Sequence, residues 1–256
     1  MKNFFILCCL WIACCAISAQ EPCPQVIPAL QQWKGGSGKL ALPAEGNIVV
    51  NPADEAVLLS TAEILADDLS LMMGWNYSVK IGKPGKNDIY MALMKPDKEL
   101  GDEGYKLSVN RYAGIEAPTR KGVFWGTRTL LQMLYKQQGK ISKGTARDFP
   151  LFPNRGFMID AGRKFFTLDY LKQYVKILSF YKMNEFQIHL NDNGFPQFFD
   201  NDWNKTYAAF RLESERFPGL TAKDGSYTKK EFTDLQRLGM ESVSYTHLRA
   251  HETTLH

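Results

Sequence analysis

The chain has 256 residues, of which 45% are hydrophobic and 23% are charged, and its formal net charge is +4. This composition is ordinary for a soluble globular protein, and the length allows one or two domains with substantial cores. Nucleic-acid binding usually requires a concentrated basic face, so the small net charge argues against it, and we expect no nucleic-acid partner.

Residues 1–19 have the pattern of an export signal. Lys2 supplies a positive charge, residues 4–17 form an apolar run, and Ser18-Ala19 offers small residues for cleavage. The run is too short to indicate a membrane span. Cys14 leaves lipid attachment open as an alternative, although the residues before it fit that pattern poorly. We therefore expect an exported protein, periplasmic or at the cell surface, with no transmembrane span in the mature chain.

The cysteines also bear on stability after export. Cys8, Cys9, Cys14 and Cys15 lie inside the signal, and Cys23 is the single cysteine outside it. The mature chain therefore cannot form an internal disulfide, and we expect its hydrophobic core to stabilise it.

Residues 20–39 contain Pro and Gly and are expected to form an extended lead-in, followed by a small α+β domain over residues 40–149. Asn51-Pro52 predicts the start of a helix, with Asn as the cap, and Gly74 its end. A second helix is predicted over roughly residues 122–137. The first helix has an apolar stripe of Val57, Leu58, Ile64, Leu65, Leu69 and Met72. Short strands are predicted at 77–81, 88–93, 105–109 and 114–117.

The next predicted domain, residues 150–242, reads as strand, helix, strand, long loop and helix. The first apolar run ends at Asp160, and the second ends in the polar cluster His189, Asn191, Asp192 and Asn193. In parallel α/β architectures, ligand-binding groups collect at the carboxyl ends of the strands. The sequence therefore predicts a binding site where these two strands end.

Local signals mark the helices of this domain. Thr167 is a candidate cap for the helix between the strands. Thr228 and Glu231 form a capping box before the last helix, and Gly239 is expected to end it. The loop at 194–227 is long for a compact domain, which favours a functional role. Its aromatic residues could line a pocket or could pack over the barrel edge; these are Phe195, Phe198, Phe199, Trp203, Tyr207 and Phe210.

The last residues, 243–256, read VSYTHLRAHETTLH and continue neither the strand nor the helix pattern. They are similar to a translated sequencing adaptor, and we interpret them as a non-native tail on a shortened reading frame. His247 and His251 are four residues apart, but they lack the H-E-x-x-H order of a zinc-protease helix, so we expect no metal site.

Two segments carry a resemblance to a known family. Arg155 to Asn193 resembles the start of the catalytic barrel of glycoside hydrolase family 20, the β-N-acetylhexosaminidases, and Gly104 to Gln138 resembles the end of that family's non-catalytic domain. The resemblance implies an α/β fold in which a small α+β amino-terminal domain precedes a (β/α)8 TIM barrel, here truncated to its first units. It also implies a glycan substrate with a terminal N-acetylhexosamine and no cofactor.

The resemblance also suggests site residues. Arg155 matches an arginine that hydrogen-bonds sugar hydroxyls, and Asp192 matches an active-site acid; both are expected to converge on one amino-sugar ring. The alternative for Arg155 is a salt bridge at the domain junction. His189 matches the second histidine of an H-x-H pattern whose first position is Gln187 here, and a buried core histidine is its alternative. Two supporting residues, Asp160 and Arg163, are expected to form an ion pair that orients the site.

The family mechanism is substrate-assisted retention, in which the substrate's own acetamido oxygen attacks the anomeric carbon. An adjacent Asp-Glu pair on a later strand orients that group and supplies the general acid. We expect this pair beyond the present sequence, so no catalytic residue is assigned here and the fragment is expected to be inactive. Two alternatives stay open: an inactive carbohydrate-binding protein on the same scaffold, and a sibling barrel glycosidase of another specificity.

Overall fold

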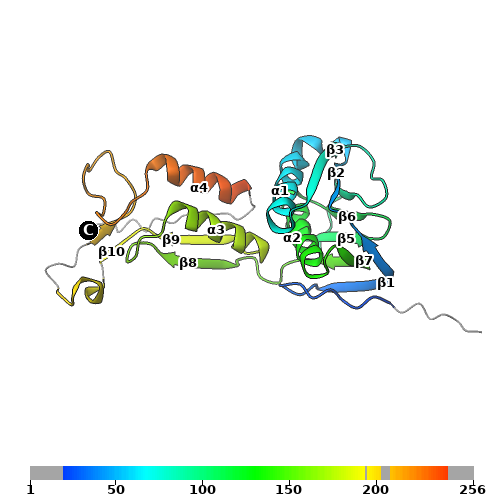
Figure 1. Cartoon of the computed structure of the whole chain (residues 1–256), viewed down its shortest axis with the longest axis horizontal. Helices are drawn as coiled ribbons and strands as arrows, with labels where there is room; N and C mark the ends of the chain where they lie inside the picture. The colour runs from blue at the N-terminus through cyan, green and yellow to red at the C-terminus, as the bar shows by residue number, and fades with distance from the viewer. Residues whose placement is uncertain (1–19, 194, 203–207, 242–256) are drawn as a thin grey trace, which may run out of the picture.

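The computed structural model describes residues 20–193, 195–202 and 208–241, which form two domains side by side along the long axis of the molecule (Figure 1). The predicted export signal at 1–19 and the predicted tail at 243–256 lie outside the described residues. Trp203 and Tyr207 of the aromatic loop lie outside them as well.

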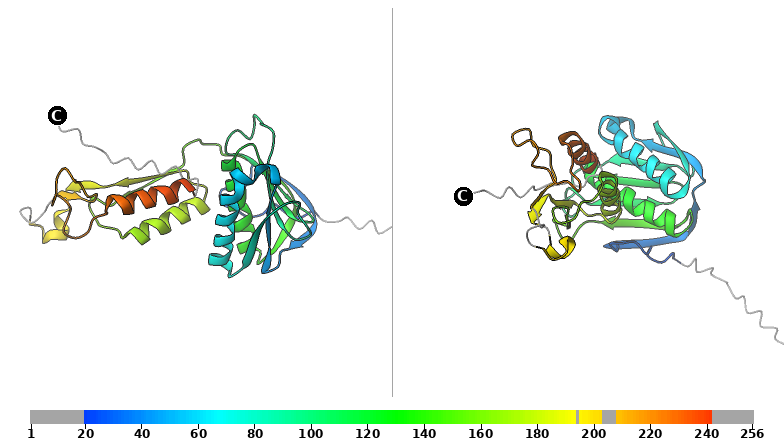
Figure 2. Two further views of the ribbon diagram at one scale, coloured as in Figure 1. Left: turned by 90° about the horizontal axis from the view of Figure 1, so that it is seen from above. Right: turned by 60° about the vertical axis from the view of Figure 1, so that its left-hand side comes forward.

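The first domain contains a seven-stranded mixed sheet in the order β1-β7-β5-β6-β4-β2-β3. Its strands are β1 (Gln32–Ala41), β2 (Glu45–Val50), β3 (Asn76–Ile81), β4 (Ile89–Leu93), β5 (Tyr105–Val109), β6 (Ala113–Ala117) and β7 (Lys140–Asp148). Two helices, α1 (Glu55–Met73) and α2 (Arg120–Lys136), pack together on one face of this sheet, and Figure 2 shows that face turned toward the second domain.

The helix signals of this domain are partly confirmed. Gly74 ends α1 in the left-handed conformation with a φ of 66°, where glycine carries no steric cost. Asn51 does not cap the helix with its side chain. Its amide instead donates to Asp54 Oδ2 at 2.7 Å, across the short 3-10 turn Pro52–Asp54 that precedes α1.

The expected lead-in at 20–39 is extended, but from Gln32 onward it forms β1. β1 pairs antiparallel with β7, and the register shifts between Gly35 and Lys39. It has no clean alternation of buried and exposed residues because it lies at the edge of the sheet, so periodicity did not predict it.

The second domain begins with a β-α-β unit, as predicted. Strands β8 (Gly156–Asp160) and β9 (Glu185–His189) are parallel, and α3 (Leu168–Phe180) connects them. A later helix, α4 (Lys229–Glu241), packs beside α3, and both helices lie over one face of the two strands (Figure 1). The shared core contains Ile159, Phe186 and Ile188 from the strands, Leu171 and Val175 from α3, and Phe232 and Leu235 from α4.

The cap signals of this domain are confirmed with one exception. The Thr167 hydroxyl accepts a hydrogen bond from the Tyr170 N–H at 3.3 Å. In the capping box, Thr228 N–H donates to Glu231 Oε2 at 2.8 Å and Glu231 N–H donates to Thr228 Oγ1 at 3.1 Å. Gly239 does not end α4: it is buried inside the helix, which continues to Glu241.

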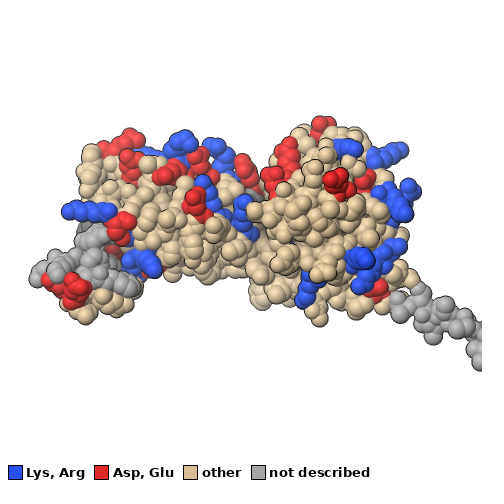
Figure 3. Space-filling model, in the orientation of Figure 1, with Lys and Arg blue, Asp and Glu red and all other residues tan. Residues whose placement is uncertain are grey.

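The loop after β9 contains a short antiparallel pair, β10 (Asn191–Asn193) and β11 (Ala208–Phe210), and a 3-10 turn, η2 (Pro196–Phe199). On the face shown in Figure 3, acidic and basic side chains are intermixed over the helices of the second domain, while the area below these helices, toward the middle of the molecule, is largely uncharged. No helix in the described part of the chain has the length and apolar character needed to cross a bilayer.

Candidate functional site

The carboxyl ends of β8 and β9 bring predicted site residues together. Asp160 is the register partner of His189, and Met158 is the partner of Gln187. Since Ile159 and Ile188 are buried in the core beneath the helices, alternation along a strand directs the side chains of Asp160 and His189 to the opposite face. In a closed barrel this is the inner face.

Arg163 connects the acids at these strand ends. Its Nη1 lies 2.7 Å from Asp160 Oδ2, and its Nη2 lies 2.8 Å from Asp192 Oδ2. Its backbone N–H also donates to Asp160 Oδ1 at 2.9 Å. His189 Nε2 lies 2.8 Å from the same Asp192 oxygen. We call Asp160, Arg163, His189 and Asp192 the strand-end cluster; the ion pair expected between Asp160 and Arg163 is present in it.

Gly162 allows the strand-end cluster to form. Its N–H donates to the His189 carbonyl at 2.8 Å. A Cβ atom at this position would lie 2.9 Å from both the Asn191 carbonyl carbon and the Asp192 nitrogen, closer than real Cβ contacts allow. The backbone after β8 therefore approaches the backbone after β9 closely enough for Arg163 to reach Asp192.

Arg211 holds the backbone between Asp160 and Arg163 in place, and this role was not predicted from the sequence. Its side chain is 1% exposed, and its Nε donates to the Ala161 carbonyl at 2.7 Å. The guanidinium also holds Asp224 through two contacts, at 2.5 and 3.0 Å. A bidentate pair of this kind is geometrically specific. An isolated arginine in an aromatic loop gives no sequence signal, because its partners are set by the fold of the loop.

The strand-end cluster is open to solvent, with side chains that are 22–33% exposed. Hydrogen bonding to Asp160, together with the charges of Asp160 and Asp192, raises the pKa of Arg163, so this residue is a permanent cation. The Phe195 ring lies 4.9 Å from the guanidinium carbon, a cation–π contact. The cluster thus presents carboxylate acceptors, a planar donor and an aromatic face to one region of solvent.

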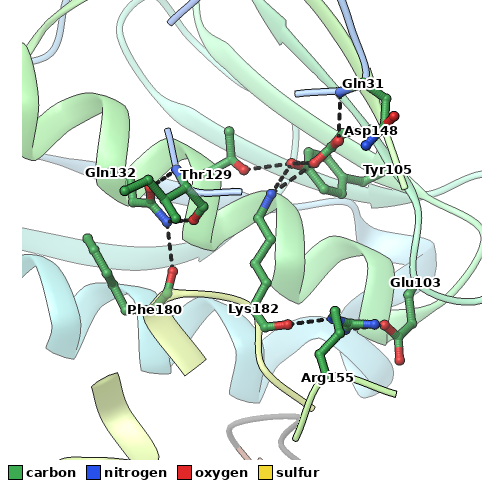
Figure 4. Close-up of polar contacts among 10 residues, drawn as sticks. Gln31, Glu103, Tyr105, Thr129, Gln132, Asp148, Arg155, Phe180 and Lys182 are labelled. Atoms are coloured by element: carbon green, nitrogen blue, oxygen red, sulfur yellow. Dashed lines mark hydrogen bonds and ion pairs between the residues drawn. The ribbon is translucent and has the colours of Figure 1, made fainter. Parts of the chain in front are cut away.

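The structure does not bring Arg155 to this cluster. Arg155 precedes β8 and lies at the domain junction, where its Nη2 contacts Glu103 Oε2 at 2.5 Å (Figure 4). Its Nε donates to the Lys182 carbonyl at 2.7 Å, and its Nη1 donates to the Phe152 carbonyl at 2.9 Å. The guanidinium is therefore held by junction groups, which matches the salt-bridge alternative.

The expectation that Arg155 and Asp192 meet at one sugar ring is wrong. Arg155 and Asp160 are separated by the length of β8, roughly 16 Å at about 3.3 Å per residue, and Asp192 lies at the Asp160 end. The sequence already carried the relevant signal, because Arg155 comes before the apolar run of β8 while site groups in parallel sheets follow their strands. Arg163 occupies the position expected of the cation.

A cavity of about 190 Å³ lies at the junction, lined in part by Trp125, Phe152 and Arg155. This cavity lies at the amino ends of β8 and β9, so it is separate from the strand-end cluster. We favour the strand-end cluster as the binding site, because its polar side chains face the same region of solvent. Within the described residues, no group of three or more His, Cys, Asp or Glu side chains could hold a metal ion.

Comparison with known proteins adds an independent finding. Residues 23–149 match the model of glycosyl hydrolase family 20, domain 2, and residues 152–252 match the model of the glycosyl hydrolase family 20 catalytic domain. Together the two matches cover nearly all of the described chain, in the order of its two domains. The strand-end cluster lies in the part matched by the catalytic domain.

Individual relatives agree with these matches. The chain is 27% identical over 246 residues to a β-hexosaminidase of Porphyromonas gingivalis, covering 89% of this chain and 29% of the relative. It is 30% identical over 164 residues to a lacto-N-biosidase of Bifidobacterium bifidum, covering 63% of this chain and 14% of the relative. The solved N-acetyl-β-hexosaminidase of Streptomyces plicatus, in complex with Thio-NAglucal, aligns with a TM-score of 0.71 and 26% identity, covering 88% of this chain and 45% of that one.

The chain therefore spans less than a third of the length of these curated relatives and just under half of the solved structure. The part it shares with the solved structure includes both domains described above, so the fold prediction of an α+β domain followed by the first units of a TIM barrel is confirmed.

Proposed function

The chain belongs to glycosyl hydrolase family 20, and on that basis we propose that it is part of a β-N-acetylhexosaminidase, which removes terminal β-linked N-acetylhexosamine from glycans. The observation that carries the proposal is the strand-end cluster within the catalytic-domain match. Its carboxylates and guanidinium lie where the active sites of TIM-barrel enzymes lie, at the carboxyl face of the strands.

The chemistry of the strand-end cluster suits sugar hydroxyls. Asp160 and Asp192 each pair with Arg163, and carboxylate oxygens are hydrogen-bond acceptors. Arg163 offers donors in a fixed plane, a geometry suited to neighbouring ring oxygens. The Phe195 ring beside it supplies an apolar face of the kind that packs against a sugar ring. We assign these residues to binding and orienting the terminal sugar.

The proposed reaction is substrate-assisted retention, with the substrate's acetamido oxygen as the nucleophile. An adjacent Asp-Glu pair is required for this chemistry. The two Asp-Glu dipeptides of the first domain have other contacts: Asp54 Oδ2 accepts from the Leu93 N–H at 2.9 Å, and Glu103 pairs with Arg155. We therefore propose that the catalytic pair comes from a later strand of the barrel, and that residues 150–241 contribute substrate binding.

A sibling activity is the second candidate, favoured by the similarity to the lacto-N-biosidase. Such an enzyme would use the same strand-end cluster to bind an amino sugar that is itself linked to another sugar unit. The two candidates differ in the space beyond the terminal sugar, which later parts of a barrel would form. A carbohydrate-binding protein without hydrolytic activity is a third reading of the same cluster.

Export is also part of the proposal. The pattern of residues 1–19 supports secretion to the periplasm or cell surface, where glycans are accessible. Direct evidence would come from the amino-terminal residue of the mature protein, since cleavage after Ala19 gives a chain that starts at Gln20. A lipid-modified cysteine at the new amino terminus would instead support anchoring.

The activity test uses a version of the protein that carries a complete barrel, with chromogenic β-N-acetylglucosaminide, β-N-acetylgalactosaminide and lacto-N-bioside as substrates. Hydrolysis of the first two supports the proposed function. Hydrolysis of lacto-N-bioside alone identifies the sibling activity, and binding of N-acetylglucosamine without hydrolysis of any substrate identifies a binding protein. Loss of the activity in an Arg163→Ala variant, but not in an Arg237→Ala variant of an exposed α4 residue, locates it at the cluster.

A further inference from the structure

Lys182 places a charged side chain of the second domain inside the first. It lies in the turn between α3 and β9, is 6% exposed, and has a positive φ of 59°. Its ammonium group lies 2.9 Å from Asp148 Oδ2 and 2.7 Å from the Tyr105 hydroxyl, both in the sheet domain (Figure 4). A lysine is rarely so deeply buried without a specific partner.

The receiving groups are held in place by the first domain alone. Asp148 Oδ1 accepts from the Gln31 N–H at 3.0 Å, and Asp148 Oδ2 accepts from the Tyr105 hydroxyl at 2.5 Å. The Tyr105 hydroxyl is also 2.6 Å from Thr129 Oγ1 on α2. We call Asp148, Tyr105 and Thr129 the docking socket. Within the described residues, the other side-chain hydrogen bonds of the socket are made by groups of the first domain.

The electrostatics make this contact selective. Burial lowers the pKa of Lys182, and the charge of Asp148 opposes that shift. A buried ion pair adds little net stability compared with an apolar pair, but separating one buried charge from its partner is very costly. A small rotation of one domain on the other would move the ammonium group out of reach of Asp148. The pair is therefore kept only in orientations of the two domains that hold the ammonium group within reach of Asp148.

We propose that Lys182 sets the orientation of the second domain on the first by inserting its ammonium group into the docking socket. Two neighbouring hydrogen bonds also join the second domain to the first. Gln132 Nε2 donates to the carbonyl of Phe180, the last residue of α3, at 2.7 Å, and Asn184 Nδ2 lies 3.2 Å from Glu103 Oε1. The chain from the end of α3 to the start of β9 is thus attached to the sheet domain on both sides of Lys182.

This attachment has a consequence for the β-α-β unit. A two-stranded sheet is marginal by itself, and β8 and β9 are held at their amino ends by the first domain. Their carboxyl ends, which carry the strand-end cluster, are left open. The proposal concerns how the two domains dock, and it holds whether or not the protein is a hexosaminidase.

The experiment is amide hydrogen exchange, read by mass spectrometry on the 256-residue chain. In a Lys182→Met variant we expect exchange of the β9 amides to accelerate at least about tenfold, while the β5 and β6 amides stay within about twofold of the unmodified protein. Lys230→Met is the matched control. Its side chain is 86% exposed and pairs with Asp234 at 2.7 Å within α4, so its removal should leave β9 unchanged.

Asp148→Asn tests the other side of the contact. Alone it leaves the Lys182 ammonium buried beside a neutral group, so β9 exchange should also accelerate. In the double variant no buried charge is left unpaired, and exchange should be no faster than in the faster single variant. Multiplying effects in the double variant, unchanged β9 exchange in Lys182→Met, or equal acceleration in both domains would each overturn the proposal.

Lys182→Gly distinguishes the effect of the Lys182 side chain on docking from the effect of the turn's backbone conformation. It also replaces Lys182→Met, with the same criteria, if that variant does not fold. Glycine accepts the positive φ of Lys182 without steric cost. If the ammonium group sets the docking, β9 exchange accelerates in this variant as well. If exchange is unchanged or slower, the turn conformation alone accounts for the docking and the proposal is wrong.

Discussion

Arg163 shows how one side chain organises the strand-end cluster. Its guanidinium spans Asp160 and Asp192, which follow two different strands. A planar fork can bond two carboxylates in fixed directions at once, whereas a lysine ammonium is a point charge on a flexible stem. The side chain therefore aligns the two strand ends as well as offering donors to a ligand.

Replacing Arg163 and Arg155 separately by alanine tests the different roles that the structure gives these two residues. In a protein with a complete barrel, Arg163→Ala should lower kcat/KM by about 30- to 1000-fold, equivalent to roughly 2–4 kcal/mol, because charge-assisted contacts to substrate are lost. Arg155→Ala should leave KM unchanged and instead lower the free energy of unfolding by about 3 kcal/mol, since it removes the cationic partner of Glu103 at the junction. Steady-state kinetics and urea unfolding measure the two effects. An increase in KM for Arg155→Ala would contradict the assignment.

Gly162 permits a second prediction. Gly162→Ala should destabilise the protein by about 1–3 kcal/mol, because the new Cβ would collide with backbone atoms of Asn191 and Asp192 that cannot move independently. Gly156→Ala, at the start of β8, is the matched control: its Cβ would lie 3.5 Å from the nearest atom, the Glu185 Cβ, which is an ordinary contact. Urea unfolding of both variants checks the difference. Equal free energies of unfolding would show that the close approach at Gly162 is not required.

At the scale of elements, Tyr227 connects the starts of two helices. Its side chain is 1% exposed, and its hydroxyl donates at 2.5 Å to the carbonyl of Phe166, which precedes the cap of α3. Tyr227 itself precedes Thr228, the cap of α4. The parallel packing of α3 and α4 on β8 and β9 therefore has a polar tie at one end in addition to its apolar core.

This tie predicts a pH dependence. Burial raises the pKa of Tyr227 to about 12, above its value of about 10 in an unfolded chain. The unfolded state therefore loses its proton first, so the stability from this group is complete below pH 10 and is lost as the pH rises toward 12. Tyr227→Phe should reduce the alkaline loss by at most about 1.4 kcal/mol per pH unit. Urea unfolding at pH 8 and pH 11 measures the slopes, and identical slopes would rule out this contribution.

At the scale of the whole molecule, β8 and β9 form a two-stranded sheet among the described residues, each with one strand neighbour. Large apolar side chains near them are exposed: 54% for Met158, 66% for Leu151 and 70% for Phe152. Open strand edges beside exposed apolar groups promote association between chains.

We therefore predict concentration-dependent self-association of this chain. Met158→Lys should weaken it, because a charge on the open sheet opposes strand pairing. Leu71→Lys on α1 is the control, since Leu71 is 67% exposed but lies in the other domain. Sedimentation velocity over a range of concentrations gives the comparison. A monomer at all concentrations, or equal effects of the two variants, would refute the prediction.

Features that depend on near neighbours were predictable from the sequence. The capping box of Thr228 and Glu231, the Gly74 terminus and the Asp160–Arg163 ion pair each join residues one to four positions apart or depend on one residue's own backbone. Such features need one helical turn or one tight turn, so the local sequence is sufficient to specify them. The alternation of strands and helices, and hence the fold class, follows from periodicity on the same short scale.

Only the tertiary structure decided which distant residues are partners. Arg155 contacts Glu103, Lys182 contacts Asp148, and β1 pairs with a strand about a hundred residues later. Arg155 therefore became a junction residue and Arg163 the cation of the strand-end cluster. The physical reason is that a charged side chain pairs with whatever the packed core places beside it, and that placement depends on the three-dimensional arrangement of whole strands and helices.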